Sequence, residues 1–546
     1  MLMQFLIILS VKGKKLMNKI HVLDCTLRDG GYCNQWRFGF NNILHIINGL
    51  TQANIDIIEC GFLTQKIIYD KDVTKFTSLD EINCLIPKNK DGHLYVAMMN
   101  YGEFNIDDIP DREDEGLDGI RVAFHKKNRY EAIKFCEKIK EKGYLVFVQA
   151  MVSLSYTDEE FLELIRIANS FKPFAFYIVD SFGMMKRKSL LRLFYMVEHN
   201  LNDNINIGFH SHNNMQLAYS NAQSLIEAQT SRDLIIDSSV YGMGRGAGNL
   251  NTELFVEYLN EVNQSQYDMK PLLIIIDEIL NDFYQKNYWG YSLPNYLSAS
   301  YAIHPNYASY LADKNTLTVE AMDAIFKRMS VEKGIEFDKD YIEQMYLEYM
   351  ASGEVQKEHE EELYSSINGK TVLLIAPGKS AIDESEKIIS CAKNENIVTV
   401  SVNYEYRHVQ TDYIFMSNLR RYRELEDECK SKCIITSNIT SNKTYYCADY
   451  RSLLSSVDAV KDNAGMMAIQ FFINFGASKI LLAGFDGYTY DISKNYASEN
   501  LEIITKNAVL DAMNKGMTEM IRQFSEKIPV KFLTTRKNVL KEKGER

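Results

Sequence analysis

The chain has little glycine and proline, with 28 and 8 residues among 546. It also lacks a long hydrophobic run: the most apolar stretch, 2–11, covers about ten residues, whereas a membrane-spanning helix needs about 20. Hydrophobic residues make up 46% and charged residues 25% of the chain. This composition excludes disordered and fibrous proteins and indicates folded domains. At about 150 residues per domain, we expect two to four of them.

Basic residues are in deficit. The chain has 61 Lys and Arg against 73 Asp and Glu, which gives a net charge of −12 and an isoelectric point near 5.5. Nucleic-acid-binding proteins have the opposite excess, so nucleic acid is not expected as a partner. The nine cysteines are an odd number without a CxxC pair. That pattern is typical of reduced thiols and predicts a cytoplasmic protein.

Residues 1–18 are predicted to be an N-terminal extension. Their apolar stretch is followed by Lys12, Lys14 and Lys15. A signal peptide has the reverse order, with charges before the apolar run and a small-residue cleavage site after it. We therefore expect neither a secretion signal nor a membrane anchor, and Met17 is an alternative start.

Eight short apolar segments, separated by longer amphipathic stretches, occur between residues 19 and 241. Such alternation predicts buried parallel strands covered by helices on both faces. Two architectures have this pattern, a closed (β/α)8 TIM barrel and an open doubly wound sheet. The segments are HVLDCT (21–26), IDIIECGF (55–62), HLYVAMMN (93–100), GIRVAF (119–124), YLVFVQA (144–150), FAFYIVD (174–180), INIGFHSH (205–212) and LIIDSSVY (234–241).

Polar residues recur at the carboxyl ends of most of these segments. In a barrel these ends converge on one mouth, where the active site lies, whereas an open sheet uses only the ends near its switch point. The pattern therefore favours an α/β TIM barrel over residues 19–260. The polar residues are Arg28, Asp29, Glu59, Asn100, His125, Gln149, Asp180, His210 and His212.

The rest of the chain is predicted to form three further parts. Residues 261–350 are expected to be a helical extension of the barrel, in which the aromatic stripe 283–291 forms core or a subunit contact. The charged stretch 351–369 is predicted to be a linker. New strand-like runs begin at 370 and predict a second, Rossmann-like α/β domain to residue 546.

His210 and His212 form an HSH motif in the seventh segment. Residues two apart on a strand point to the same side, so both imidazoles are expected in the barrel mouth, where they can share one cation. A carboxylate beside two imidazoles leaves a divalent ion with open positions for substrate. Asp29 is the expected third ligand, because only the eighth strand separates the first from the seventh in a closed barrel. The glycine-rich loop after the eighth segment is expected to present Asn249, whose carbonyl oxygen could join.

An HxH pair alone is more often two ordinary hydrogen-bonded histidines than a metal site. Here it occurs with three other motifs: CTLRDGG (25–31), DSFG (180–183) and GMGRGAGNLNTE (242–253), the pair itself lying in GFHSHNN (208–214). Together, the four motifs resemble the metal-dependent aldolase and acyltransferase barrels, which include 4-hydroxy-2-oxovalerate aldolase, 3-hydroxy-3-methylglutaryl-CoA lyase, and the homocitrate and isopropylmalate synthases. The resemblance covers about residues 20–260 and is strongest to the 4-hydroxy-2-oxovalerate aldolase branch.

The resemblance implies pyruvate enolate chemistry: a carbon–carbon bond is made or broken next to a 2-oxo acid, with an aldehyde as second reactant and a homo-oligomer as the assembly. Arg28 would stabilise the enolate oxygen and Ser181 would hold the substrate carboxylate. A dication and a guanidinium at the keto oxygen fit this chemistry, because negative charge develops there. The implied ligands of Mn²⁺ or Mg²⁺ are Asp29, His210 and His212, with Asn249 as a further ligand or a residue that supports one.

Two departures from the family pattern stand out. The hydroxyoxovalerate aldolases have a histidine thought to be the base where this chain has Tyr32, and a phenol is a poor base at neutral pH. Tyr32 is therefore expected to act as an acid or through water, unless the substrate differs. The lyase branch carries a cysteine after the motif that contains the Asn, but this chain has none between Cys136 and Cys391. That argues against 3-hydroxy-3-methylglutaryl-CoA lyase itself.

The C-terminal region contains TVLLIAPGKSA (371–381), TDYIFMSN (411–418) and NAGMMAIQFFINFGASKILLAGFDGY (463–488). These segments resemble the Rossmann-like domain of bacterial sialyltransferases and flagellin glycosylation proteins. Amides after the first strand could receive a phosphate, although the full P-loop pattern is absent. The resemblance implies a sugar-nucleotide site, or a relic that only binds, at Gly378, Ser380, Asn403 and Asp486.

Two rival functions stay open. One is a Claisen-type acyltransferase, which would consume an acyl-CoA in place of an aldehyde. The other is a glycan-building or glycan-binding protein in which the C-terminal domain acts and the barrel is a scaffold.

Overall fold

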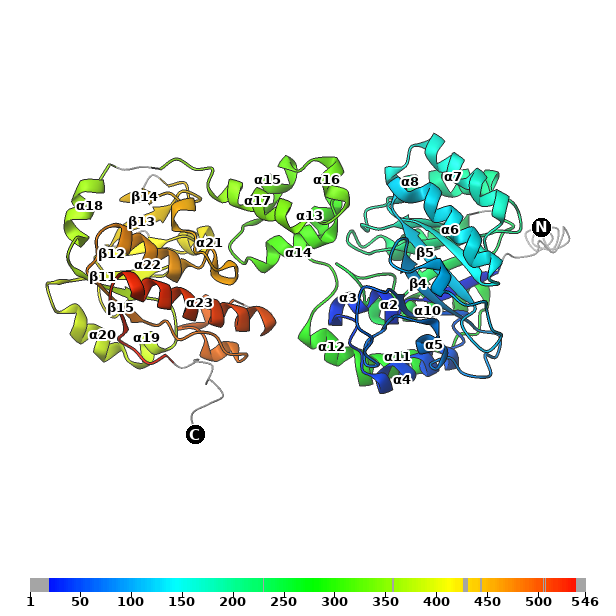
Figure 1. Ribbon diagram of the computed structural model, residues 1–546, viewed down its shortest axis with the longest axis horizontal. Coiled ribbons are helices and arrows are strands. Elements are labelled where there is room, and N and C mark those ends of the chain that lie inside the picture. The colour runs from blue at the N-terminus through cyan, green and yellow to red at the C-terminus, as the bar shows by residue number, and fades with distance from the viewer. Residues whose placement is uncertain are drawn as a thin grey trace, which may run out of the picture. The chain divides into compact units, whose positions relative to one another are not determined.

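The computed structural model describes residues 19–536 except 229, 356–357, 426–430, 442–443, 504 and 506. The expected N-terminal extension lies outside these residues. The chain forms two compact units (Figure 1). The first runs to Ser309 and includes Val331–Phe337, and the second comprises Tyr310–Ser330 and the described chain from Asp338 onward. Within the described ranges, every helix is too short or too polar to cross a membrane.

Eight parallel strands close into a barrel in the first unit. Their order is β1-β9-β8-β7-β6-β5-β4-β2, and β2 pairs with β1 through Leu23 and Ile57. This closing pair confirms the predicted barrel and excludes the open sheet. A two-residue strand, β3 (Lys75–Phe76), pairs with the end of β2. The barrel strands are β1 (Ile20–Asp24), β2 (Ile57–Leu63), β4 (Leu94–Asn100), β5 (Gly119–Phe124), β6 (Leu145–Ala150), β7 (Ala175–Asp180), β8 (Asn206–Ser211) and β9 (Leu234–Ser238).

Helices follow most of the barrel strands and lie around them (Figure 1). The connection between β4 and β5 is an exception, with only a 3-10 turn, Ile106–Asp108. A capping box fixes the start of α7, where Thr157 and Glu160 satisfy each other's backbone amides. The helices are α2 (Thr26–Asp29), α3 (Gly31–Asn34), α4 (Phe40–Gln52), α5 (Leu79–Asn83), α6 (Arg129–Glu141), α7 (Asp158–Phe171), α8 (Arg187–Asn200), α9 (Ala218–Glu227) and α10 (Thr252–Asn263).

The barrel has two apolar layers. Alternate strand residues such as Leu23, Val96 and Ile235 form an inner cluster. Their neighbours, such as Val22 and Ile236, belong to the larger cluster that includes the surrounding helices. Because both faces of each strand are buried, the strands are continuous apolar runs in the sequence.

The predicted helical extension is divided between the units. The first unit takes α11 (Met269–Ile275), the π-helical turn Ile276–Leu280, α12 (Asn281–Lys286), α13 (Leu293–Ser300) and α16 (Val331–Ile335). The second takes α15 (Val319–Arg328) and α17 (Lys339–Met350), and the division falls inside α14 (Pro305–Asp313). Part of the predicted linker is helical, because α18 spans Glu360–Ile367.

The aromatic stripe 283–291 is partly core. Trp289 is buried, packs edge-on against Tyr241 and Tyr284, and donates from its indole nitrogen to the Tyr241 carbonyl at 2.9 Å. Tyr288 and Tyr291 are exposed. The prediction that the stripe forms core is therefore confirmed for Trp289 and not for the two exposed tyrosines.

The second unit contains a seven-stranded parallel sheet in the order β14-β13-β12-β11-β10-β15-β16. Helix α20 contacts β11, while α22 contacts β10, β11 and α23. A second α/β domain is therefore present. Its elements are β10 (Thr371–Ile375), α19 (Ser380–Asp383), α20 (Ser385–Ala392), β11 (Ile397–Val402), β12 (Tyr413–Met416), α21 (Leu419–Arg423), β13 (Lys432–Thr436), β14 (Tyr446–Ala448), α22 (Ala464–Asn474), β15 (Lys479–Ala483), α23 (Asn507–Lys527) and β16 (Val530–Phe532).

Candidate functional site

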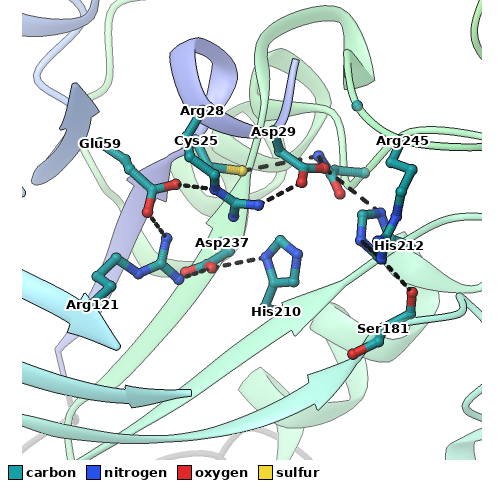
Figure 2. Close-up of polar contacts among 12 residues, drawn as sticks. Cys25, Arg28, Asp29, Glu59, Arg121, Ser181, His210, His212, Asp237 and Arg245 are labelled. Carbon is teal, nitrogen blue, oxygen red and sulfur yellow. Dashed lines mark hydrogen bonds and ion pairs between the residues drawn. The ribbon is translucent and has the colours of Figure 1, made fainter. Parts of the chain in front are cut away.

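Asp29, His210 and His212 lie together at the carboxyl end of the barrel (Figure 2). Each side chain offers a ligand atom, and the three atoms lie within 4.8 Å of one another, so one cation can contact all three. All three residues are buried. Asp29 ends the short helix after β1, and the histidines lie at the end of β8, with β9 between the two strands. The structure thus brings the three residues predicted as ligands into one cluster that could hold a metal ion.

Buried polar atoms around this cluster have no hydrogen-bond partner in the described structure. His212 Nδ1, Asn249 Oδ1 and Arg28 Nη2 are such atoms. An unsatisfied buried group costs about 1–3 kcal/mol, so three in one place indicate a missing ligand. The imidazole nitrogen and the amide oxygen suit a divalent cation beside a carboxylate, and the guanidinium donor suits an anion next to it. The residues therefore fit the metal that the sequence implies.

Asn249 bridges the cluster. It pairs with His212 through an isolated backbone bridge, and its Nδ2 donates to Asp29 Oδ2 at 2.7 Å. Its Oδ1 is the unpartnered atom. Asn249 is therefore placed both to orient the carboxylate and to offer an oxygen to a cation.

The glycine-rich loop carries backbone close to these ligands. A Cβ on Gly244 would lie 2.3 Å from Asn249 Nδ2 and 2.7 Å from Asp29 Oδ2. Gly248 has a φ of +83°, and a Cβ there would lie 1.9 Å from the Gly242 carbonyl oxygen. The glycines are thus required by close packing around Asn249, as the sequence suggested.

We expect Gly244→Ala to weaken Mn²⁺ binding by about 10- to 100-fold, the usual range when a residue that orients metal ligands is lost. The added methyl must displace Asn249 or Asp29. Isothermal titration calorimetry measures the affinity. Gly516→Ala is the control, because that glycine lies in α23 and a Cβ there meets only valine methyl groups. Equal affinities in Gly244→Ala and wild type would refute this role of the loop.

Arg28 is fixed between two carboxylates. Its Nη1 donates to Asp29 at 2.5 Å and its Nε to Glu59 at 2.8 Å, and all three side chains are buried (Figure 2). Burial alone would raise the pKa of Asp29, but the Arg28 charge and the two ligand histidines hold it well below its usual value. Burial would also lower the pKa of Arg28, yet Glu59 and Asp29 hold it well above its usual value. The site therefore has an ionised carboxylate beside a permanently charged guanidinium.

Arg121 and Asp237 orient His210. Arg121 is fully buried; its Nη1 donates to Glu59 at 2.8 Å and its Nη2 to Asp237. Burial would raise the pKa of Asp237, but the Arg121 charge lowers it, so the carboxylate is ionised and can only accept. Asp237 therefore accepts from His210 Nδ1 at 2.9 Å, which leaves His210 Nε2 unprotonated for a metal.

Glu59 and Asp180 hold neighbouring groups in place. Glu59 accepts from both buried arginines. Asp180 accepts from the backbone amides of Met184 and Met185 at 3.0 and 2.9 Å, while burial raises its pKa to about 6. Both carboxylates therefore hold neighbouring groups in place, which is a structural role.

Ser181 and Tyr32 lie near the cluster, and both contact Arg245. Ser181 Oγ accepts from the Val152 amide at 2.8 Å, and its carbonyl accepts from Arg245 Nη2 at 3.0 Å. The Tyr32 ring, 40% exposed, lies 5.3 Å from the Arg245 guanidinium carbon and packs edge-on against Trp36. Tyr32 is therefore at the solvent edge of the site and Ser181 is inside it.

The other polar residues at the carboxyl ends of the strands make different contacts. Asn100 donates to Glu103 at 3.1 Å, and His125 lies 3.9 Å from Glu336. Gln149 is buried. Four further residues near the cluster were not predicted from the sequence: Arg121, Asp237, Arg245 and His304. Arg121 and Asp237 could have been noticed in the sequence, because each is a charged residue inside an otherwise apolar strand.

The second unit has a cavity of about 220 Å³. Gly378, Asn403 and Asp486 line it, as expected, at loops that follow β10, β11 and β15. Ser380 does not line it: the residue is buried, and its amide donates to Asp486 Oδ2 at 2.7 Å. An internal carboxylate thus occupies the amide at which a phosphate could have been received, which corrects that expectation.

The fold and site define a closed parallel barrel with a buried Asp–His–His centre at its mouth. Residues 122–277, which include both histidines and Asn249, match the family model described as HMGL-like. A 4-hydroxy-2-oxovalerate aldolase of Pseudoalteromonas translucida is 27% identical over 258 residues, which are 46% of this chain and 72% of that protein. The same-named protein of Stutzerimonas stutzeri is 26% identical over 277 residues, or 50% and 77%.

Solved structures are similar to part of this chain. The N-terminal domain of a proposed aldolase from Bacteroides vulgatus is 27% identical and covers 55% of this chain and 98% of that one, with a TM-score of 0.46. The HMG-CoA lyase of Brucella melitensis is 17% identical and covers 49% and 98%, with a TM-score of 0.39. In sequence, the barrel is thus similar to the HMGL-like lyases and aldolases.

Proposed function

We propose that the first unit is a divalent-metal-dependent aldolase or lyase that makes or breaks a carbon–carbon bond next to a 2-oxo acid such as pyruvate. The observation that carries this proposal is the buried Asp29–His210–His212 cluster, with Arg28 beside it, at the barrel mouth. The similarity to proteins named 4-hydroxy-2-oxovalerate aldolase supports the reaction class and the choice of substrate.

A Mn²⁺ or Mg²⁺ ion held by the cluster would polarise the keto group of the 2-oxo acid. Arg28 Nη2, which has no hydrogen-bond partner among the described residues, donates to the keto oxygen as that atom gains negative charge. The ion pairs of Arg28 with Asp29 and Glu59 hold the guanidinium in position. The Ser181 hydroxyl accepts from a backbone amide, so its own proton is available to the substrate carboxylate.

Proton transfer to and from the second reactant falls to the solvent side of the site. Tyr32 lies there, and its phenol can donate a proton to the aldehyde oxygen or exchange one through water.

We expect the protein to exchange the methyl protons of pyruvate with deuterium when Mn²⁺ or Mg²⁺ is present, and a chelator to stop the exchange. Proton NMR measures this step without any knowledge of the aldehyde. A panel of aldehydes with pyruvate then identifies the second reactant. Absence of exchange with every divalent metal tested would contradict the proposal.

The acyltransferase alternative also proceeds through an enolate. It is distinguished by the second reactant, because acetyl-CoA would be consumed and free thiol released in place of aldehyde loss. The aldolase is favoured here because the relatives in the two sequence matches given above carry the aldolase name.

A second candidate function belongs to the second unit. Its strand order reverses at β10, which has β11 on one side and β15 on the other, and the cavity lies at loops after these strands. In open parallel sheets, ligands bind at this place. We propose a sugar nucleotide as the ligand, and calorimetric titration with cytidine and uridine nucleotides tests it.

A further inference from the structure

Arg245 reaches the barrel mouth from the glycine-rich loop. Its Nη2 donates to the Ser181 carbonyl at 3.0 Å and lies 3.2 Å from His212 Nε2, and its Nη1 lies 3.1 Å from His304 Nε2 (Figure 2 shows the first two contacts). The Tyr32 ring lies on another side. Among the described residues, no carboxylate is within ion-pair distance of Arg245, and its buried Nε has no partner. The guanidinium in the mouth thus has no ion-pair partner within the part of the chain that the structure describes.

His304, from the segment before α14 in the first unit, presents a second donor to the same place. The Asn306 amide donates to His304 Nδ1 at 3.2 Å. A backbone amide can only donate, so the ring lone pair is at Nδ1 and the proton of the neutral ring is at Nε2. Burial, and then the Arg245 charge, hold the pKa of His304 well below its usual value, which agrees with a neutral ring. In the tautomer set by the Asn306 amide, the N–H groups of Arg245 Nη1 and His304 Nε2 lie 3.1 Å apart, and neither can accept from the other.

Such an arrangement is satisfied by an acceptor that both donors can reach. An unpaired charge in a largely buried position is costly, and a guanidinium beside a second N–H is matched by a carboxylate. Phe182 and Phe337 pack their rings near His304, with centroids at 5.9 and 6.2 Å. An anionic oxygen is the group that fits.

We propose that Arg245 and His304 form an anion-binding corner of the mouth that takes a carboxylate of a reacting substrate. This inference rests on the proposed function for the identity of the substrate. Two reactants could supply the group: the 2-oxo acid, whose carboxylate would lie toward Ser181, or an aldehyde that carries a carboxylate of its own. The chemistry of recognition is the same in both.

The test uses Arg245→Gln and Arg245→Lys in the full chain, with Arg187→Gln as control. Arg187 is a surface residue of α8, 66% exposed, whose nearest carboxylate is 3.9 Å away. Calorimetry measures the binding of Mn²⁺ first, and then of pyruvate and oxalate to the Mn²⁺-loaded protein. We expect Arg245→Gln to weaken pyruvate and oxalate binding by on the order of 10- to 100-fold, as the loss of a charged hydrogen-bond donor predicts. Arg245→Lys should lose less, and the control nothing.

A second measurement, the KM for an aldehyde with and without a carboxylate, shows which reactant supplies the carboxylate. If the aldehyde supplies it, pyruvate and oxalate binding stay at the wild-type level, while the KM for succinic semialdehyde rises about 10-fold in Arg245→Gln and the KM for butanal does not. His304→Gln should then give a smaller change in the same direction, since a neutral donor is lost. Unchanged binding together with unchanged KM values would overturn the proposal.

Failure of the proposed function would look different. Wild-type protein would then exchange no pyruvate protons, yet oxalate would still bind and Arg245→Gln would still weaken it. If the wild-type protein exchanges pyruvate protons but Arg245→Gln changes neither ligand binding nor the KM values, only the anion-binding corner is refuted.

Discussion

Asn in place of Asp29 is expected to abolish Mn²⁺ binding and to lower pyruvate proton exchange by about 1,000-fold or more, since a metal supplies several kcal/mol to such a reaction. Asp29 is the one carboxylate in the ligand cluster. The surrounding positive charges hold its pKa well below its usual value, so the wild-type ligand is ionised at neutral pH. The Asn side chain has the same shape but no charge. His212→Ala removes another ligand and should have the same effect.

Two tryptophans give this experiment a fold control. Trp36 and Trp289 are the only ones in the chain, and both lie in the first unit. Trp36 donates to the Arg28 carbonyl at 2.8 Å, so its fluorescence reports on the strand end that carries Asp29. We expect an unchanged spectrum in Asp29→Asn, and no effect of Asp158→Asn, an exposed control at the start of α7. Wild-type Mn²⁺ affinity in Asp29→Asn would rule out the metal centre.

The largest effect on stability is expected from Arg121→Met. Arg121 has no exposed surface, and its loss leaves Glu59 and Asp237 as buried carboxylates with one cationic partner fewer each. Breaking a buried ion pair from one side costs about 3–5 kcal/mol. Urea denaturation followed by tryptophan fluorescence measures this in the first unit alone. Tyr177, which donates to Asp237 at 3.0 Å, keeps part of the network intact.

A double variant separates charge from packing. Adding Glu59→Gln to Arg121→Met removes the charge of one of the two carboxylates that lost a cationic partner, so the combined loss should be smaller than the sum of the single losses. If packing alone mattered, the two losses would add. A free energy of unfolding for Arg121→Met within about 1 kcal/mol of wild type would refute the role given to this network.

Much of the barrel could be predicted because each strand is buried on both faces. The segment 119–124 matches β5 residue for residue, and the HSH motif with Asp29 identified the ligand cluster. These features depend on local pattern and on strand neighbours that a closed barrel fixes.

The network behind the ligands could not be predicted in the same way. Arg121 meets Asp237 across 116 residues of sequence, and nothing in the strand itself specifies that pairing. Arg245 meets His304 only because the helical extension returns to the mouth. In the second unit, Ser380 binds a carboxylate 106 residues away. Each of these contacts is set by tertiary packing of segments that have no pattern in common.

The chain passes between its two units three times, at 309–310, 330–331 and 337–338. Helix α17 follows the last of these passages, and its Tyr346 donates to Asp462 at 2.5 Å inside the second unit. A single proteolytic cut therefore cannot release both halves whole. A fragment that starts at residue 370 exposes the site where Tyr346 had docked, and one that ends at 309 lacks the turn at Val331–Phe337 on which His304 rests. The two proposed functions are better separated by point substitution in the intact polypeptide.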